Sequence, residues 1–470
     1  MSDAPEAPTN EAPEHVSFRE TARVFLRIGL LSFGGPAGQI ALMHRELVEK
    51  RKWIDEPRFL HALSYCSLLP GPEAQQLATY LGWLLHRTKG GLTAGTLFIL
   101  PGFVVMLALS MLYAQFHEVH TIAGLFDGLK AVVLGIVLEA LLRVGKRALT
   151  SPLHKLLAAL AFIALFCFGV PFPLVIASAG LIGILGTQLS PAARSGEASH
   201  SPGRSGDTPS MQPKPSLLDK MAARGELSHT TPSWRRALRV AAVSLVLWCL
   251  PLLLAFGISG AHSVYFEEGL FFSKVAMVTF GGAYAVLSYV GQRAVEDFGW
   301  LTPRQMIDGL GLAETTPGPL ILVVQFVAFL GAYSAPGSLP PLLAGTLGAC
   351  MSVWVTFVPC FFWVFLGGPY IEALRNVRAL TAALSAITAS VVGVILNLSL
   401  TFALQALFHD VNTEHFGWLR FPRPTLSSFD WHVGAIGIVG MVALFKLKLG
   451  VPKTLLIGAA LGVALSWLPT

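Results

Sequence analysis

Long apolar segments separated by short polar ones make up most of this chain. Apolar blocks of about 17 to 25 residues recur from residue 24 onward, and a helix of that length crosses the hydrocarbon core of a bilayer. The pattern predicts an all-α polytopic membrane protein with roughly 10 to 13 membrane segments. With 53% hydrophobic and 13% charged residues, the composition excludes an ordinary soluble domain, and the lipid bilayer is the expected surrounding.

Two polar stretches interrupt the apolar pattern. Residues 1–23 form an acidic, Pro-rich tail without the basic and short apolar regions of a signal peptide, so we expect no cleaved signal. Residues 190–233 are rich in Ser, Pro, Gly and charges, and their low apolar content predicts a hydrophilic linker that does not fold alone. The chain then divides into a first repeat at 24–189, an extra transmembrane helix at 234–257 and a second repeat at 258–470.

The two halves resemble each other when the sequence is shifted by 247 positions. Without a gap, the shift aligns two glycine motifs, a tryptophan and two Pro-Gly-Pro motifs: Phe33-Gly34-Gly35 with Phe280-Gly281-Gly282, Trp53 with Trp300, and Pro70-Gly71-Pro72 with Pro317-Gly318-Pro319. Ten of these 40 aligned positions are identical. A duplicated membrane unit accounts for this similarity.

The distribution of Lys and Arg predicts the orientation of the two copies, because these residues concentrate in cytoplasmic loops. Equivalent loops differ in their counts; residues 45–58 contain five and residues 292–305 contain two. If the Phe-Gly-Gly and Pro-Gly-Pro segments are re-entrant, 16 of the counted residues lie inside and 4 outside, whereas full spans throughout give 13 and 7. Both arrangements give two inverted-topology repeats, and the re-entrant one fits better.

Inversion requires an odd number of crossings between the halves, and the extra helix at 234–257 supplies it. The N-terminus and the linker then lie in the cytoplasm, and the C-terminus lies outside a multi-pass inner (plasma) membrane protein. The alternative is that the charge asymmetry is accidental. The net charge of +6 is interpreted as loop charge, so no nucleic-acid partner is indicated.

The glycine and proline motifs point to a binding site. They break helices, and broken helices at membrane depth are tolerated where protein or a water-filled cavity satisfies the freed backbone groups. Matched breaks in two repeats are typical of a transporter site. A helix restarted after Pro72 or Pro319 has free N–H groups that attract an anion. The alternative is that Gly and Pro here only permit close helix packing.

Polar residues accompany each break. Arg27 aligns with Lys274, seven residues before the first glycine, and Ser32 aligns with Thr279. The two cations are candidates for contacts with an anion, and the alternative is that they extend to lipid headgroups from the helix ends.

The two Pro-Gly-Pro motifs have different polar neighbours: Glu73 and Gln76 follow the first, whereas Glu314, Thr315 and Thr316 precede the second. The two carboxylates are candidates for binding coupling protons. The alternative for Glu73 is that it complements the helix dipole. Lys130 and Glu139, within an apolar block, are weaker candidates.

Motifs for other functions are missing from the sequence. There is no phosphate-binding G-x-x-x-x-G-K-[ST] motif, and none of G-x-S-x-G, H-E-x-x-H or paired Cys-x-x-Cys occurs. The His409-Asp410 and Glu414-His415 cluster lies in a hydrophilic stretch and is interpreted as a solvated turn instead of a metal site. We therefore predict no enzyme activity, no catalytic residue, no cofactor and no metal.

The motifs resemble those of the chromate transporter (CHR) family. The resemblance rests on Phe33 to Pro36 followed by a basic stretch with Trp53, on Leu69 to Gln76, and in the second half on Thr279 to Tyr284 and Gly311 to Pro319. It covers nearly the whole chain except the tail and the linker. It implies the long, two-domain branch of that family, whose members export chromate from bacterial cells and give chromate resistance.

The resemblance implies that the motif positions contribute to substrate binding. Ala283 stands where the first half has Pro36, so the two halves are not equivalent. Together with the polar residues above, the expected substrate-binding set is Arg27, Ser32, Gly34, Gly35, Pro36, Pro70, Gly71, Pro72, Glu73, Gln76, Lys274, Thr279, Gly281, Gly282, Glu314, Thr315, Thr316, Pro317, Gly318 and Pro319.

The identity of the substrate depends on the resemblance and not on the residues. Chromate is a tetrahedral dianion, and helix N-termini with hydroxyls and one or two cations suit it. Sulfate has the same shape and charge, so a sulfate or other oxyanion transporter is the alternative, as is an uncoupled anion channel. Whether the protein forms a homodimer is left open.

Overall fold

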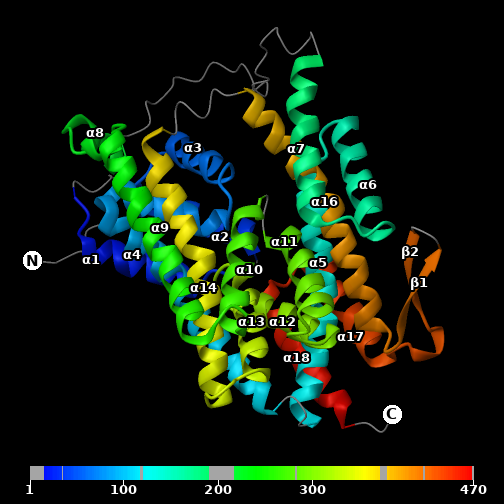
Figure 1. Cartoon of the computed structure of the whole chain (residues 1–470). Coiled ribbons are helices and arrows are strands. Elements are labelled where there is room, and N and C mark those ends of the chain that lie inside the picture. Colours follow the sequence, from blue (N-terminus) through cyan, green and yellow to red (C-terminus); the bar gives the residue numbers. More distant parts are fainter. Residues whose placement is uncertain are drawn as a thin grey trace, which may run out of the picture.

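The computed structural model describes residues 15–33, 35–116, 120–189, 216–280, 283–370, 378–416 and 419–467, and nearly all of its elements are helices (Figure 1). The first half consists of α1 (Phe18–Leu30), α2 (Gly35–His44), the π-helical η1 (Arg45–Lys50), α3 (Glu56–Cys66), α4 (Glu73–Phe116), α5 (His120–Ala148), α6 (Pro152–Phe166) and α7 (Phe172–Leu189). Between the halves lie α8 (Leu217–Ala223), the short η3 (Ser228–Thr230) and α9 (Trp234–Ser259).

The second half repeats the same order of elements. It consists of α10 (Val264–Val278), α11 (Ala283–Gln292), the π-helical η4 (Arg293–Asp297), α12 (Pro303–Thr315), η5 (Leu320–Leu322), α13 (Val323–Ser334), α14 (Pro341–Gly367), η6 (Gly368–Tyr370), α16 (Arg378–Leu407), β1 (Val411–Phe416), β2 (Leu419–Pro424), η7 (Leu426–Ser428), α17 (Trp431–Met441), η8 (Val442–Lys446) and α18 (Val451–Ser466). A π-helical segment follows the second helix of each half, so the sequence similarity extends to an unusual local structure.

Helix α4 is two helices that meet at a sharp turn. His86 (φ −137°) and Arg87 (φ +54°) leave the helical conformation, and the chain folds back so that Gly82 approaches Gly90. The first leg, residues 73–85, is about 20 Å long, shorter than the roughly 30 Å of a bilayer core. In the second half, α13 followed by α14 repeats this arrangement, with a loop in place of the sharp turn.

Within the described residues, four helices are long and apolar enough to cross a membrane: Glu73–Phe116, Trp234–Ser259, Pro341–Tyr370 and Ala382–Leu407. Five further apolar helices have 10 to 17 residues. The structure therefore confirms a helical protein with the character of a membrane protein. Next to the glycine and proline motifs, α1, α2, α3, α10, α11, α12 and the first leg of α4 are shorter than a full span.

The two halves are interleaved. Helix α5 of the first half packs against α17 and α18 of the second, and α16 of the second half packs against α6 and α7 of the first. Small residues permit this close approach: a Cβ on Gly128 of α5 would meet the carbonyl oxygen of Gly458 on α18. Neither half can therefore bury its own apolar surface without the other.

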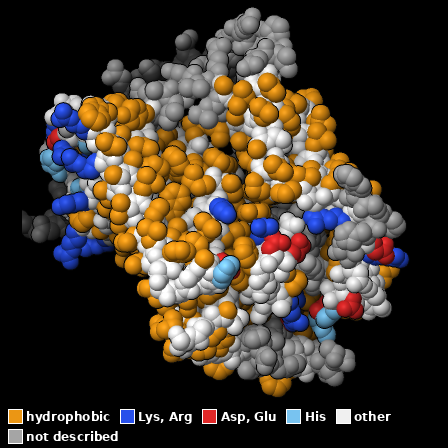
Figure 2. Space-filling model, viewed as in Figure 1, with side chains coloured by type: hydrophobic (Ala, Val, Ile, Leu, Met, Phe, Trp, Pro, Cys, Tyr) orange, Lys and Arg blue, Asp and Glu red, His pale blue; other side chains and the backbone are white. Residues whose placement is uncertain are grey.

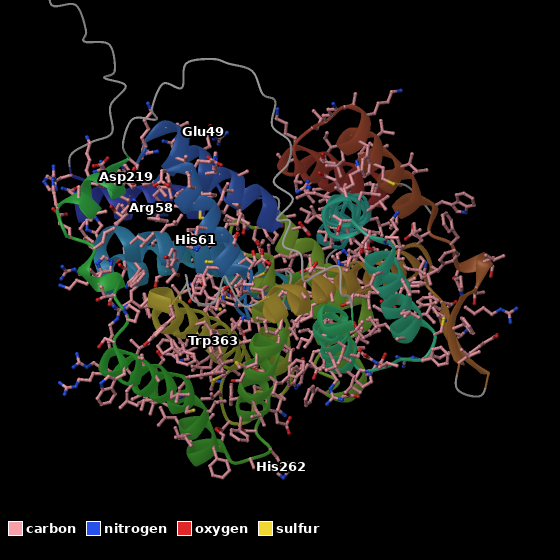
Figure 3. All side chains as sticks on the ribbon, turned by 90° about the horizontal axis from the view of Figure 1, so that it is seen from above. Glu49, Arg58, His61, Asp219, His262 and Trp363 are labelled. Carbon is pink, nitrogen blue, oxygen red and sulfur yellow. The ribbon has the colours of Figure 1, made fainter. Side chains whose placement is uncertain are left out.

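The described part of the linker docks on the first half. The N–H groups of Leu217 and Leu218 donate to the carbonyls of Lys52 and Trp53, each at 3.2 Å, and both leucine side chains are buried. Arg58 of α3 and Asp219 of α8 form an ion pair of 3.0 Å beside them (Figure 3). This segment packs against α3 and the preceding loop.

A second charged network lies next to this docking site, in the basic loop after α2. Glu46 is 2% exposed and pairs with Lys50 at 2.7 Å and with Arg51. Burial alone would raise the pKa of the Glu46 carboxyl, but the hydrogen bonds from Lys50 and Arg51 outweigh it and hold the pKa below its ordinary value.

Figure 2 shows hydrophobic side chains over much of one face, with one group of Lys and Arg at the margin near α1, α4 and α8 and further charged side chains across the other half of the view. Helix α9 has no buried residue and exposes many leucines, such as Leu238 and Leu253. An apolar surface of this extent is covered by lipid in a membrane protein.

One element departs from the predicted all-α fold. Strands β1 and β2 form an antiparallel hairpin between α16 and α17, with Arg423 paired to Glu414 at 2.6 Å. Val411, Thr413 and Phe416 of β1 are of residue types that are enriched in strands. No group of three or more potential metal ligands occurs in the described part of the chain, including this hairpin.

Candidate functional site

Each half contains two breaks between helices, at the positions of the sequence motifs. In the first half α1 ends at Leu30 and α2 begins at Gly35, whose φ of +72° suits glycine. In the second half α10 ends at Val278 and α11 begins at Ala283. Gly34, Gly281 and Gly282 lie outside the described residues.

The Pro-Gly-Pro motifs form the second pair of breaks. The first separates α3 from α4, and the second separates α12 from η5. Gly71 has φ +124° and Gly318 has φ +99°, conformations that side chains with a Cβ rarely adopt. Pro72 ends the first break directly before the first residue of α4, where proline costs no hydrogen bond.

The four breaks meet in two pairs, and each pair joins the two halves. The N–H of Gly71 donates to the carbonyl of Thr279 at 2.7 Å, and the N–H of Gly318 donates to the carbonyl of Ser32 at 2.9 Å. These residues are equivalent under the shift of 247, so the two bonds form a reciprocal exchange. Backbone groups released by breaking one half are satisfied by the other half.

This exchange also pairs helix N-termini. Ser32 precedes the start of α2 by three residues, and Gly318 precedes the start of η5 by two, so α2 and α13 begin close together. By the same reasoning, α11 and α4 begin close together at the Gly71 bond. Helix N-termini carry unpaired N–H groups and partial positive charge, so each pair favours an anion.

The hydroxyl groups that are predicted to contact the anion donate hydrogen bonds to backbone carbonyls of their own segments in the structure. Ser32 donates to the carbonyl of Ile28 at 2.6 Å, and Thr279 donates to that of Val275 at 2.7 Å. Thr315 and Thr316 likewise donate to carbonyls three residues earlier. A hydroxyl has one proton to donate, so each side chain must rotate and give up its present hydrogen bond before it can donate to an oxyanion.

The polar residues beside the first Pro-Gly-Pro support the break. Gln76 is fully buried, and its Nε2 donates to the carbonyl of Pro70 at 2.7 Å, so it closes the turn around Gly71. Glu73 begins α4, where its carboxylate complements the positive end of the helix, and it interacts with the Ser67 side chain. Beside the second motif, Glu314 is 4% exposed at the end of α12.

The structure adds a residue to this set that sequence reasoning missed. Gln39 of α2 is 1% exposed, and its Nε2 donates to the carbonyl of Gly318 at 2.6 Å and reaches that of Ser32 at 3.4 Å. It therefore connects both members of one break pair. Its sequence signal is an amide four residues after Gly35, but the shift places an apolar residue, Val286, at the equivalent position.

Two further contacts fix the breaks against the long helices. A Cβ on Gly71 would lie 2.7 Å from Sγ of Cys360 on α14, and a Cβ on Gly102 of α4 would meet the carbonyl oxygen of Pro317. Gln325 of α13 donates to the carbonyl of Phe103 at 2.9 Å. The second leg of α4 and helix α14 therefore enclose the breaks, and the enclosure leaves no room for larger residues there.

The two predicted cations do not join this centre. Both Arg27 on α1 and Lys274 on α10 are exposed, so their side chains lie on faces directed away from the buried breaks. The alternative interpretation, in which they extend to lipid headgroups, agrees with this placement.

A buried carboxylate that sequence reasoning also missed lies outside the centre. Glu268 on α10 is fully buried between α13 and α14, and Cβ atoms on Gly331 or Gly348 would lie 2.7 Å from its carboxyl oxygens. The shift aligns it with Thr21, which is also buried and hydrogen-bonds His86 at 3.0 Å. A polar group at this depth is costly, so Glu268 is a candidate functional residue.

A separate polar cavity of about 300 Å³ includes the weaker candidate Lys130 in its lining, together with Arg304 and His409. Lys130 and Arg304 both pair with Asp127, at 2.9 and 3.0 Å. Asp127 thus offsets one of these two positive charges. Glu139 is not part of this cavity and pairs with Arg143.

Comparison with known proteins relates the chain to one family. The profile described as "Chromate transporter" matches residues 19–184 and 266–463, one segment in each half. The chain is 32% identical over 403 residues to the chromate transport protein of Pseudomonas aeruginosa, covering 84% of this chain and 83% of the relative. It is 24% identical over 451 residues to a probable chromate transport protein of Synechococcus elongatus, covering 95% of each.

A shorter relative matches part of the chain. An uncharacterized transporter of Bacillus subtilis is 35% identical over 123 residues, covering 26% of this chain and 62% of the relative. No solved structure is significantly similar to the chain.

Proposed function

The chain belongs to the chromate transporter family, and from this we propose that it is a secondary transporter that exports chromate across the inner membrane and confers chromate resistance. Relatives named as chromate transport proteins match over most of their length, which supports chromate as the substrate. The sequence has no ATP-binding motif, so the movement is driven by ion or potential gradients.

The observation that carries the proposal is the reciprocal pair of hydrogen bonds between the breaks of the two halves. Gly71 with Thr279 and Gly318 with Ser32 each bring together helix N-termini from opposite halves. A tetrahedral dianion placed there receives N–H groups and the positive ends of helix dipoles from both repeats. Motion of one half relative to the other then changes the access to this centre.

The two halves are proposed to have opposite orientations in the membrane. The Lys and Arg counts of equivalent loops support this, and α9, which lies between the two repeats, supplies the odd crossing that inversion requires. The N-terminus and linker then lie in the cytoplasm. The re-entrant arrangement is supported by the short helices on either side of each break.

The membrane potential supports export as the direction. Moving one charge through 100 mV is worth about 2.3 kcal/mol, so a dianion leaving a negative interior gains about 4.6 kcal/mol per 100 mV. Proton coupling through Glu73 or Glu314 is not needed for export on this argument. It becomes necessary if transport continues without a potential.

The test is chromate uptake into inside-out vesicles or proteoliposomes that contain the full chain, with an imposed potential and excess sulfate in parallel. We expect potential-dependent chromate accumulation that sulfate inhibits, because the two anions share shape and charge. Protein-free liposomes and the Gly337→Ala protein are controls, since Gly337 lies in the open loop between α13 and α14.

Each alternative function gives a different result in this assay. Sulfate transport without chromate transport would identify sulfate as the substrate. A conductance without saturation would indicate an uncoupled anion channel. No chromate movement under any gradient would refute the proposal.

A further inference from the structure

A cavity of about 720 Å³ lies between α9 and the helices α4 and α14. Helix α9 belongs to neither repeat and packs mainly against α14 and α10. Most of the lining is apolar, with contributions such as Val243 and Leu247 from α9, Phe103 from α4 and Phe357 from α14. The cavity is therefore a mostly apolar groove beneath α9, a helix that lies outside both repeats.

The charged residues of this groove gather at one end. Arg236 and Arg239 in the first turns of α9, and Thr88 directly after the turn in α4, all line it. From Arg236 to Leu247 the groove follows α9 for eleven residues, which is about 16 Å. That length is close to half of a roughly 30 Å bilayer core, so the groove extends through a single leaflet with its cations at the surface.

The arginines of the groove lack an anionic partner. Arg236 donates through Nη1 to the carbonyl of His229 and lies 5.2 Å from the centre of the Trp83 ring, whereas its Nη2 is buried without a hydrogen-bond partner in the described structure. Arg239 forms no ion pair with any described residue and is exposed. A phosphate group at this position would satisfy the buried Nη2 and pair both guanidinium groups.

We propose that the groove binds one anionic phospholipid, with its phosphate on Arg236 and Arg239 and an acyl chain along the apolar wall formed by α4, α9 and α14. The lipid fills the space between α9 and the repeats, so it holds the linking helix in place. Basic pockets between membrane helices bind anionic headgroups in this way. The inference concerns a different place from the proposed transport centre, and binding is measured without transport.

An anionic phospholipid fits this groove better than other occupants. A free oxyanion would pair with the arginines and leave the apolar length of the groove uncovered. A zwitterionic lipid brings its own cation next to two arginines, which weakens the electrostatic gain. A helix from a second copy would have to bring a group that pairs with the two arginines. The exposed side chains on the neighbouring face of α9 are leucines, which cannot do so.

The test uses the purified full chain, stripped of lipid in detergent, with phosphatidylglycerol or phosphatidylcholine added at equal mole fractions. Native mass spectrometry counts the retained lipid, and thermal unfolding reports its effect. We expect one phosphatidylglycerol to be retained and to raise the unfolding temperature more than phosphatidylcholine does. In Arg236→Gln/Arg239→Gln the affinity for phosphatidylglycerol should fall roughly thirtyfold, because each arginine near an anionic headgroup contributes about fivefold.

Two further variants keep the test decisive. Arg235→Gln is the matched control, since Arg235 is the neighbouring arginine, is not part of the lining and lies over Trp234 at 5.7 Å. It should retain the lipid. Ser244→Phe fills the groove and should lose the lipid with both arginines present.

Three results would overturn the proposal. The first is equal stabilisation by both lipids, which indicates general solvation of the apolar surface. The second is equal loss of lipid in Arg235→Gln and in the double variant, which indicates a diffuse surface charge. The third is a dimer that Ser244→Phe dissociates, which assigns the groove to a second copy of the chain.

Discussion

Replacing Gly71 by alanine tests the break that joins α3 to α4. Gly71 has φ +124°, and an added Cβ would lie 2.7 Å from Sγ of Cys360 and 2.9 Å from Nε2 of Gln76. The backbone conformation is strained for any residue with a Cβ. In addition, Gln76 cannot move freely, because its Nε2 closes the turn by donating to the carbonyl of Pro70.

The expected loss of stability has two causes, the backbone conformation and the close contacts of the added Cβ. The left-handed backbone costs about 1 to 3 kcal/mol, and the forced shift of packed neighbours costs about 1 to 3 kcal/mol more. Gly71→Ala should therefore lose about 2 to 6 kcal/mol of stability at the transport centre. Gly337→Ala is the matched control, because Gly337 also has positive φ (+62°) but no atom lies within 4 Å of its added Cβ. It should lose about 1 to 2 kcal/mol from the backbone alone.

The assay measures thermal unfolding in detergent and chromate flux in proteoliposomes for both variants. We expect Gly71→Ala to reduce flux more than tenfold, while Gly337→Ala stays within twofold of wild type. Adding Cys360→Ala to Gly71→Ala removes the closest contact and should restore part of the packing cost, while the contact with Gln76 and the backbone cost remain. Wild-type stability and flux in Gly71→Ala would refute the claim that this glycine is required by the geometry of the break.

Three other substitutions test different parts of the account. Gln39→Leu removes the amide that joins one break pair and takes away the side-chain donor of the Gly318 carbonyl, so thermal unfolding should show a loss of about 1 to 3 kcal/mol. An unchanged unfolding temperature would contradict this expectation. Because the pKa of Glu46 is lowered on folding, its contribution to stability is present above the ordinary value near 4.5 and is lost as the pH falls through the folded pKa. A plot of stability against pH from 7 to 3 should therefore be flatter for Glu46→Gln than for Glu49→Gln. Equal slopes would disprove the role of the Glu46 ion pairs. Arg27→Ala and Lys274→Ala should each change chromate flux less than twofold, because both side chains are exposed, and a tenfold loss in either would place that cation in the transport path.

The sequence predicts the breaks and the duplication well, because both depend on residues with strong local effects. The Phe-Gly-Gly and Pro-Gly-Pro motifs mark the breaks. Single prolines do not, since Pro101, Pro251 and Pro359 lie within helices. The shift of 247 positions identifies Gly71 with Gly318 and Ser32 with Thr279. The shift shows which residues are equivalent. It does not show that the N–H of each glycine donates to a carbonyl of the other half, because that contact depends on how the halves pack together.

Other features depend on tertiary packing and cannot be predicted from sequence alone. The seven-residue spacing places Arg27 on the same helical face as the glycine motif only if the helix continues, but α1 ends at Leu30 and the break changes the direction of the chain. Gln39 is buried by its contact with the Gly318 break, and Glu268 is buried by α13 and α14; in both cases the contacting segment is distant in sequence. The fold-back at His86 and Arg87 uses a non-glycine residue with positive φ, which residue preferences argue against.

The central claim is that two oppositely oriented halves form one transport centre, and side-specific labelling tests it most directly. In a background with the five native cysteines replaced, His200→Cys in the linker and Ala335→Cys between α13 and α14 are exposed separately to a membrane-impermeant thiol reagent in intact cells and in inside-out vesicles. The account predicts that residue 335 is labelled in intact cells and residue 200 in inside-out vesicles. Labelling of both positions from the same side would contradict it.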